Sequence, residues 1–143
     1  MTADSRSAEK IRPYARRQGA ARLDRLAYEI GRSRKSADAE AVHDLRVSIR
    51  RLMSCLKAFP EFFSSSGKKK VRRRLREIMA LAGEVRDRDI AIELGHQAGL
   101  YEESELLAKL AGERTEAARR LRLVLKHSVK RGMTEKWRGR LGL

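Results

Sequence analysis

A line of basic side chains with helical spacing runs along residues 41–59. His43, Arg46, Arg50 and Lys57 repeat at intervals of three, four and seven residues, which places them on one face of an α-helix. Such a row of hydrogen-bond donors can hold a linear polyanion without reading a sequence in it. Arginine suits this chemistry because its planar fork donates two parallel N–H bonds to one phosphate, whereas lysine acts as a point charge.

An apolar seam lies beside this basic face in the same segment. Its members recur at alternating spacings of three and four residues: Val42, Leu45, Ile49, Leu52, Leu56 and Phe59. They predict one amphipathic helix over residues 41–59 that packs against other helices and leaves its basic face available for binding. Pro60 ends this helix because proline disfavours the helical conformation of the residue before it.

The densest run of positive charge is KKKVRRRLR, which spans residues 68–76 and contains no acid. Like charges four residues apart destabilise a helix, and a bound anion would relieve that repulsion. A solvated charged face or a nucleic-acid-binding tail has a similar composition. However, this run lies within an apolar-periodic helix, which favours one side of a polyanion groove. The predicted donors of this helix are Lys68, Arg72, Arg76 and Arg86.

A similar basic stripe on the next helix includes Arg122 and Lys126. These side chains can contribute to the groove or can serve only to keep the helices soluble. We include both among the predicted polyanion-binding residues, because a stripe of donors at helical spacing suits an extended anion.

Hydrophobic periodicity predicts four amphipathic helices, over about residues 9–30, 41–59, 68–98 and 102–129. We expect Gly31 to end the first helix, and Asp38 or Ser36 to cap the second. Joined by short links, these helices predict an all-α, antiparallel four-helix bundle. The chain is expected to be a single domain over residues 1–143, with a helical core at about 9–130 and a flexible basic tail at 131–143 that contains Trp137.

The composition indicates a polyanion as the partner. Thirty-four Lys and Arg against nineteen Asp and Glu give a formal net charge of +15. The single cysteine, Cys55, cannot form an intrachain disulfide and is expected to be a small buried hydrophobe. No apolar run approaches the ~18 residues that a membrane span requires, and the polar start does not resemble a secretory signal. We therefore expect a cytoplasmic protein.

Two short segments carry a resemblance to a known family. His43-Asp44-Leu45-Arg46-Val47, followed by Arg50-Arg51-Leu52, and the later GEVRDRDI at residues 83–90 resemble, in order, the two signature segments of the CHAD family, the conserved-histidine α-helical domain. The resemblance runs from about residue 11 to about residue 129 and covers only the N-terminal half of a full-length member. It implies an all-helical basic domain that binds inorganic polyphosphate and can associate with polyphosphate granules. Arg51, within the first segment, joins the predicted phosphate ligands.

His43 has three possible roles, namely a core histidine, a metal ligand or a phosphate donor. Metal is disfavoured, since no second His or Cys stands at ligand spacing on that helix, and no cofactor is expected. Its place on the basic stripe, together with the CHAD resemblance, favours phosphate contact. A phosphate would favour the protonated ring, so binding is predicted to strengthen as pH falls through the histidine range.

Asp89 falls on the apolar seam of its predicted helix. The surrounding run from Arg86 to Asp89 can form surface ion pairs of little energetic value. A carboxylate on the seam, however, requires an arginine or a capping partner. We predict that Asp89 braces a groove arginine, with Arg46 or Arg86 as the candidates.

Three functions from different classes fit these patterns: non-catalytic polyphosphate binding, nucleic-acid binding, and catalysis on phosphates. Catalysis has the least support, because neither GxxxxGK[ST] nor a paired acidic metal site is present in the sequence. Nucleic acid is the alternative, since a basic helical protein binds DNA at low salt. Aromatic residues make up only 5% of the chain, and no recognition motif is visible. The half-length resemblance further predicts a two-fold homodimer.

Overall fold

A computed structural model of the chain describes residues 3–143, and all the regular secondary structure in this range is helical. The helices are α1 (Ala3–Lys35), α2 (Ala39–Ala58), α3 (Ser65–Gln97), α4 (Glu105–Lys130) and α5 (Met133–Leu141), with a short 3₁₀ helix at Pro60–Phe62. The prediction of an all-α protein is therefore confirmed. The simple antiparallel four-helix bundle is not, because the described chain contains a fifth helix and its long helices cross.

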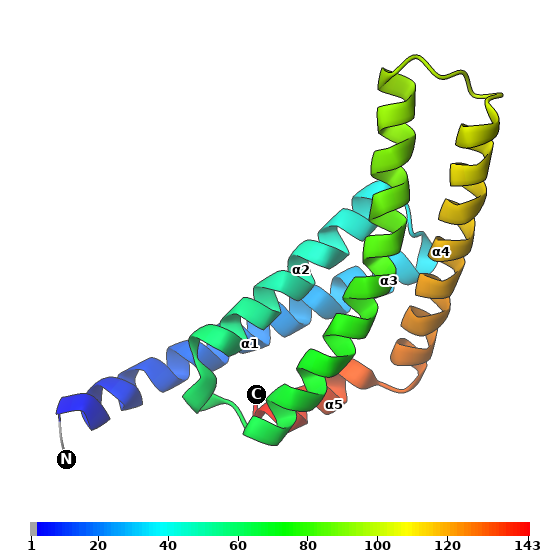
Figure 1. Cartoon of the computed structure of the whole chain (residues 1–143). Helices are drawn as coiled ribbons and strands as arrows, with labels where there is room; N and C mark the ends of the chain where they lie inside the picture. The colour runs from blue at the N-terminus through cyan, green and yellow to red at the C-terminus, as the bar shows by residue number, and fades with distance from the viewer. Residues whose placement is uncertain (1–2) are drawn as a thin grey trace.

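The helices are arranged as two crossed hairpins. Helices α1 and α2 run antiparallel to each other, as do α3 and α4, and the second hairpin crosses the first (Figure 1). Helix α5 lies at the base of the second hairpin and contacts α3, α4 and α1. The far ends of α3 and α4 stand clear of α1 and α2 (Figure 1). Helices α2 and α3 are consecutive in the chain, and the contact between them joins the two hairpins.

All five α-helices contribute to one hydrophobic core. The predicted seam of α2 is confirmed, because its five aliphatic members from Val42 to Leu56 are completely buried, while Phe59 is half-buried. The predicted seam of α3 is buried from Val71 to Val85. On α4, Leu106 is exposed and its neighbour Leu107 is buried instead. The apolar spacing therefore identified the core face of α2 and that of α3 as far as Val85, whereas it misplaced the start of the α4 face.

Helix α1 is longer at both ends than the sequence predicts. It begins at Ala3 and contains Pro13 in its interior. Its exposed first turns contact the 3₁₀ helix at Pro60–Phe62, where the Arg12 guanidinium lies 5.6 Å from the Phe62 ring centroid. Gly31 does not end it. The helix continues because buried Ser33 donates a hydrogen bond of 3.2 Å to the Ala41 carbonyl, and such tertiary contacts outweigh the weak helix propensity of glycine.

The caps of α2 and α3 follow from ordinary side-chain chemistry. The Asp38 carboxylate accepts a 2.8 Å hydrogen bond from the Ala41 amide and caps α2, as predicted. Ser64 caps α3 by accepting from the Gly67 amide. Gly67 is also a close-packing point, since a Cβ there would lie 2.2 Å from the Arg140 carbonyl oxygen of α5. Only glycine permits α3 and α5 to approach this closely.

The C-terminal segment is an ordered part of the core, which corrects both the predicted flexible tail at 131–143 and the core boundary at residue 130. Trp137 and Leu141 of α5 are each only 2% exposed, and Arg138 forms an ion pair with Asp24 of α1. This hydrogen-bonded pairing raises the pKa of Arg138. The tail folds because Met133, Trp137 and Leu141 recur every four residues and present one apolar face.

Candidate functional site

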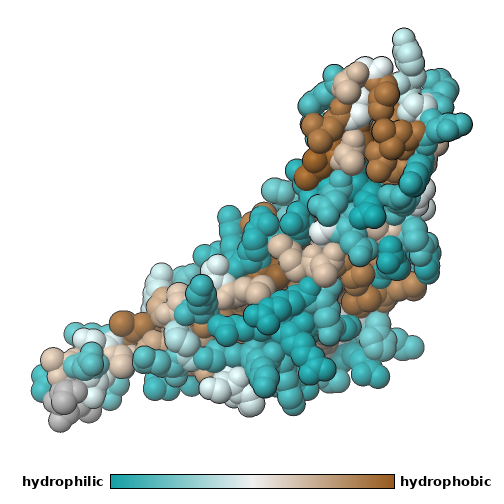
Figure 2. All heavy atoms as spheres, in the orientation of Figure 1, coloured by the Kyte–Doolittle hydropathy of each residue, from teal (hydrophilic) through white to brown (hydrophobic). Residues whose placement is uncertain are grey.

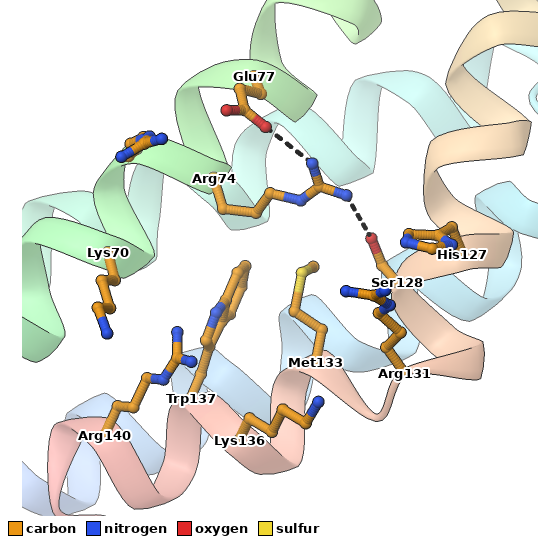
Figure 3. A pocket seen from close by; sticks show the side chains of 11 residues that line it. Lys70, Arg74, Glu77, His127, Ser128, Arg131, Met133, Lys136, Trp137 and Arg140 are labelled. Atoms are coloured by element: carbon orange, nitrogen blue, oxygen red, sulfur yellow. Dashed lines mark hydrogen bonds and ion pairs between the residues drawn. The ribbon is translucent and has the colours of Figure 1, made fainter.

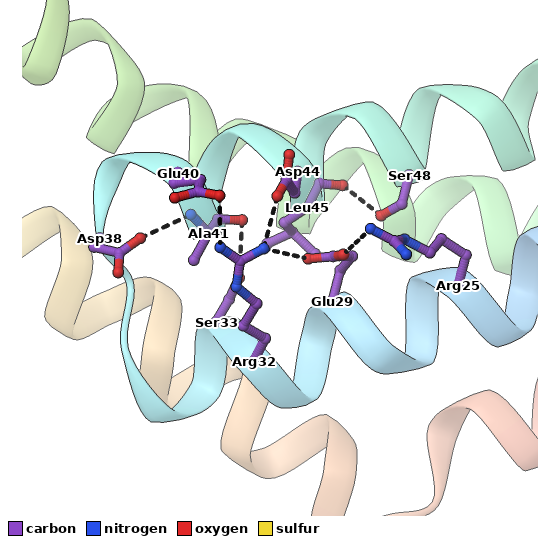
Figure 4. Close-up of polar contacts among 10 residues, drawn as sticks. All are labelled: Arg25, Glu29, Arg32, Ser33, Asp38, Glu40, Ala41, Asp44, Leu45 and Ser48. Atoms are coloured by element: carbon purple, nitrogen blue, oxygen red, sulfur yellow. Dashed lines mark hydrogen bonds and ion pairs between the residues drawn. The ribbon is translucent and has the colours of Figure 1, made fainter.

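A cluster of ion pairs fixes α1 against α2 near the start of α2 (Figure 4). One guanidinium nitrogen of Arg32 lies 2.6 Å from the Asp44 carboxylate and 3.5 Å from buried Glu29. Its other terminal nitrogen lies 3.4 Å from Glu40. The hydrogen bond to Asp44 raises the pKa of Arg32. Asp44, in the first signature segment, therefore links α2 to α1.

One flank of α3 faces α4. Arg74, Glu84 and Arg88 identify this flank, because they contact Ser128, Arg120 and Glu113 of α4, respectively. With 3.6 residues per turn, the side chains of Arg72, Arg76 and Arg86 lie on the opposite flank of the buried α3 seam. Since α3 also packs against α2, we infer that this basic flank borders α2.

The corresponding argument applies to α2. Its α1-facing flank contains Asp44, which pairs with Arg32, and Arg46 and Lys57 lie on the opposite side of the buried α2 seam. Arg50 lies at the outer edge of that side, where it also lines a groove with residues of α1. Both rows therefore border the α2–α3 contact. We call these residues the α2–α3 surface; its members are Arg46, Arg50, Lys57, Lys68, Arg72, Arg76 and Arg86.

The members of the α2–α3 surface have no acidic partners among residues 3–143. None of the seven forms an ion pair there. The Nε atom of Arg46 is buried and has no hydrogen-bond partner within the described chain. Lys68 is fixed at the end of the row, because its ammonium donates a 2.6 Å hydrogen bond to the Pro60 carbonyl. Uncompensated donors of this kind are what an anionic ligand satisfies.

Other predicted ligands lie elsewhere. His43 and Arg51 line a shallow pocket of about 270 Å³ between α1 and α2, together with Arg25 and Asp44. The contact between His43 and phosphate stays a prediction. On α4, Arg122 donates a 3.2 Å hydrogen bond to the Arg34 carbonyl.

Helical geometry places Arg122 and Lys126 on the flank of α4 that faces away from α3. Lys126 is exposed there. These two side chains therefore do not join the α2–α3 surface. Their binding to polyphosphate stays a prediction, and it would need a contact outside that surface.

Asp89 has an arginine partner, as predicted, but it is neither Arg46 nor Arg86. Its carboxylate lies 2.9 Å from Arg114 Nε and 3.4 Å from Nη2, and Nη2 also donates a 2.7 Å hydrogen bond to the Ala37 carbonyl. Arg114 reaches Asp89 because α4 returns antiparallel along α3. Asp89 therefore fixes Arg114, which also contacts the link before α2 and is not a member of the α2–α3 surface.

A second basic site, which the sequence analysis missed, lies at the base of the second hairpin between α3, α4 and α5 (Figure 3). We call it the basal pocket; its volume is about 430 Å³. Its cationic side chains are Lys70, Arg73, Arg74, Arg131, Lys136 and Arg140, beside His127. The lining contains one acid, Glu77, which lies 2.8 Å from Arg74. Trp137 and Met133 provide its apolar wall.

The basal pocket was missed because the C-terminal segment was expected to be flexible. Three of its cations, Arg131, Lys136 and Arg140, come from that segment or from its junction with α4. The sequence did carry a signal, namely the four-residue spacing of Met133, Trp137 and Leu141. If that spacing had been interpreted as an amphipathic helix, the basic side chains of this segment would have been predicted to lie near those of α3.

Cys55 is buried, as predicted. Burial raises the pKa of its thiol, and the nearby positive charge of Arg22 offsets part of that effect. The thiol therefore forms the reactive thiolate less readily than an ordinary cysteine does. Within residues 3–143, no group of three or more His, Cys, Asp or Glu side chains could hold a metal ion. None of the described helices is long and apolar enough to cross a membrane.

The fold and its basic surfaces define an all-helical protein with uncompensated cationic sites. The family model of the CHAD domain matches residues 17–142, so the chain belongs to the CHAD family. The match extends through α5, beyond the end at about residue 129 expected from the signature segments. The family is associated in general with polyphosphate binding. Comparisons with curated proteins and with solved structures found no match.

Proposed function

We propose that this chain binds inorganic polyphosphate along the α2–α3 surface and does not alter it chemically. The observation that carries this proposal is a set of cations without acidic partners on two neighbouring helices. Some arginines at the α1–α2 link and the α3–α4 contact, such as Arg32, Arg88 and Arg114, do have acidic partners. The seven cations of the α2–α3 surface have none among residues 3–143.

The spacing of the donors suits a linear anion. Donors four residues apart, such as Arg72 and Arg76, are separated by about 6 Å along the helix axis, which is close to the separation of alternate phosphates in an extended chain. Each arginine can donate two parallel hydrogen bonds to one phosphate. A polyphosphate chain bound this way is recognised by its charge density and repeat, and no base or sugar contact is required.

The basal pocket extends the same function. Lys70, Arg73 and Arg74 lie on the other side of the helix that presents Arg72. A polyphosphate chain long enough to pass around the start of α3 would therefore contact both sites. This arrangement favours long polyphosphate chains over short ones. Once a long chain is bound at one site, the rest of it is held at a high effective concentration near the other site.

The proposed absence of catalysis rests on the composition of the α2–α3 surface. All of its members are lysine or arginine, and none of these side chains can act as a metal-binding carboxylate or as a carboxylate general base. Phosphoryl transfer in known enzymes depends on such groups or on a glycine-rich phosphate loop. The cations alone bind and neutralise the anion. We further infer that the protein associates with polyphosphate granules where these are present.

A titration with long-chain polyphosphate tests the site. We expect the variant Arg50→Ala/Arg72→Ala/Arg76→Ala to lose at least about tenfold in affinity, since hydrogen bonds to charged groups are worth about 1.5–3 kcal/mol each. The matched control Arg16→Ala/Arg17→Ala/Lys109→Ala removes the same charge from exposed positions outside both sites. It should bind within about twofold of the wild type, because exposed charges at a distance are screened. Equal losses in the two variants would show general charge attraction and overturn the proposed site.

Competition with duplex DNA separates polyphosphate from the alternative partner. At about 150 mM salt, attraction between exposed charges is screened beyond about 8 Å, so we expect DNA at equal phosphate concentration to leave polyphosphate bound. Ready displacement by DNA would contradict polyphosphate binding as the function and favour a nucleic-acid-binding protein.

A further inference from the structure

The free end of the α3–α4 hairpin displays an apolar surface that the function proposed above does not use. Figure 2 shows hydrophobic side chains gathered at this end of the molecule. We call residues 90–112 the hairpin tip. Its exposed large hydrophobic side chains are Ile90, Leu94, Leu100, Tyr101 and Leu106, and Tyr101 is 80% exposed.

The hairpin tip is an ordered structure. Gly99 takes a left-handed conformation with φ of 83°, and the Leu100 amide donates a 3.0 Å hydrogen bond to the Gly95 carbonyl. A Cβ at Gly95 would lie 2.8 Å from Leu107 Cδ2, so the two helices approach closely there. The Ser104 side chain caps α4 by accepting from the Leu107 amide. The exposed apolar side chains are therefore presented on a defined surface.

The hairpin tip is also acidic, in contrast to the rest of the chain. It contains four glutamates, Glu93, Glu102, Glu103 and Glu105, and one lysine, Lys109, while the whole chain has a net charge of +15. This end therefore attracts a polyanion less than the basic remainder of the chain does. An apolar surface with acidic neighbours fits instead a partner that has an apolar centre and basic edges.

This chain itself carries such a partner surface. A groove of about 440 Å³ between α1 and α2 has apolar walls that include Tyr14, Val47 and Phe59. Its charged members are all basic, namely Arg22, Arg50 and Arg51. The Tyr14 and Phe59 rings stand edge to face at 5.9 Å, and Tyr14 is about half exposed. We call it the α1–α2 groove.

We propose that the hairpin tip of one copy docks in the α1–α2 groove of a second copy, with Tyr101 and Leu94 against the apolar walls and Glu93 and Glu103 against Arg50 and Arg51. Charge complementarity selects this occupant over a direct contact between two tips, which would bring like charges together. If each tip occupies the other groove, the contacts close as a two-fold dimer. Arg50 also belongs to the α2–α3 surface, so polyphosphate and the second copy compete for it.

Sedimentation equilibrium of the full chain at low salt tests the association. We expect a wild-type dimer whose dissociation constant rises about tenfold or more from 50 mM to 500 mM salt, since the Debye length shortens. Tyr101→Ser should weaken the dimer about tenfold, as expected for an aromatic anchor. Tyr28→Ser, which changes an aromatic side chain that is 61% exposed on α1, should leave it unchanged. A monomeric wild type, or equal effects of the two tyrosine variants, would overturn the proposal.

A charge exchange identifies the two surfaces. We expect Glu93→Lys/Glu103→Lys to abolish the dimer and Arg50→Glu/Arg51→Glu to do the same. The combination of all four substitutions in one chain should restore it, because the signs are again complementary and the net charge is that of the wild type. Failure of the combined chain to dimerise, or no effect of the groove variant, would overturn docking of tip in groove.

Polyphosphate titration of Tyr101→Ser separates this inference from the proposed function. The tip lies outside the α2–α3 surface, so this variant should bind polyphosphate at least as well as the wild type does. Loss of the dimer with retained polyphosphate binding supports both proposals. If this variant lost polyphosphate binding, the hairpin tip would take part in binding polyphosphate. The inference that the tip contacts only protein would then be wrong.

Discussion

Two groups of arginines in this molecule have the same side chain and opposite surroundings. Arg32 and Arg114 lie against acids and backbone carbonyls, with their guanidinium groups 2.6 Å from Asp44 and 2.9 Å from Asp89, respectively. Arg72 and Arg76 of the α2–α3 surface have no acidic partner within residues 3–143. The comparison shows that the positions of the few acids decide which cations form ion pairs between helices and which stay available to a ligand.

The two groups also differ in where they lie. The paired arginines join segments that are distant in sequence, as Arg114 joins α3, α4 and the link before α2. The unpaired ones follow one another along single helices. Pairing therefore stabilises the crossing of the hairpins, whereas the unpaired rows cost stability through like-charge repulsion. Four variants test this division, and the first of them changes the core packing beneath both groups.

Trp137→Ala should have the largest effect on stability. Trp137 is buried between α5 and the second hairpin and forms the wall of the basal pocket. We expect a loss of about 3–5 kcal/mol in the free energy of unfolding, as for other buried aromatic side chains. Urea unfolding measures it, with the exposed Tyr101→Ala as the control. A loss below about 1 kcal/mol would contradict the buried position of α5.

Asp89→Asn tests the paired group. It leaves the Arg114 guanidinium, which is largely buried, without its carboxylate. We expect a loss of about 1–3 kcal/mol in unfolding free energy with unchanged affinity for polyphosphate. If polyphosphate affinity fell and stability did not, Asp89 would serve the ligand site, as the sequence analysis predicted.

Arg72→Gln/Arg76→Gln tests the unpaired group. Glutamine has helix propensity similar to that of arginine, so relief of repulsion between charges four residues apart should raise the free energy of unfolding by about 0.2–0.5 kcal/mol. Affinity for polyphosphate should fall in the same variant. Thermal unfolding without ligand and a binding titration measure the two changes. Destabilisation would show that these arginines have structural partners after all.

Arg119→Ala should have the smallest effect. Arg119 pairs with Glu116 on the exposed face of α4, and its hydrogen bond lowers the pKa of Glu116 below the ordinary 4.5. A lowered carboxyl pKa adds stability above the ordinary pKa, and this stability is lost as pH falls through the lowered value. The two unfolding curves should therefore differ slightly at neutral pH and converge below about pH 4. A difference that grows on acidification would contradict this assignment.

Much of the fold could be predicted from local patterns. The seam from Val42 to Leu56 gave the buried face of α2, and Asp38 gave its start. The errors lie at Gly31 and in the segment after residue 130, where contacts between helices outweigh local propensity. Helix α1 continues through Gly31 because Ser33 donates a hydrogen bond to α2. Helix α5 is ordered because its three apolar side chains pack against the common hydrophobic core.

The candidate site could be predicted only in part. The rows containing Arg50 and Arg72 follow from helical spacing, which is a property of the sequence. The partner of Asp89 and the basal pocket do not, because each combines residues of different helices. Arg114 is 25 positions from Asp89, and Arg140 lies on α5 while Lys70 lies on α3.

The sequence by itself determined the helices, their apolar faces, the excess of positive charge and the family to which the chain belongs. The tertiary structure alone decided which cations are neutralised. An ion pair depends on distance in space, and the crossing of two hairpins brings Asp44 to Arg32 and Asp89 to Arg114. It leaves the cations at the α2–α3 contact without acids within the described chain, and these define the proposed ligand surface.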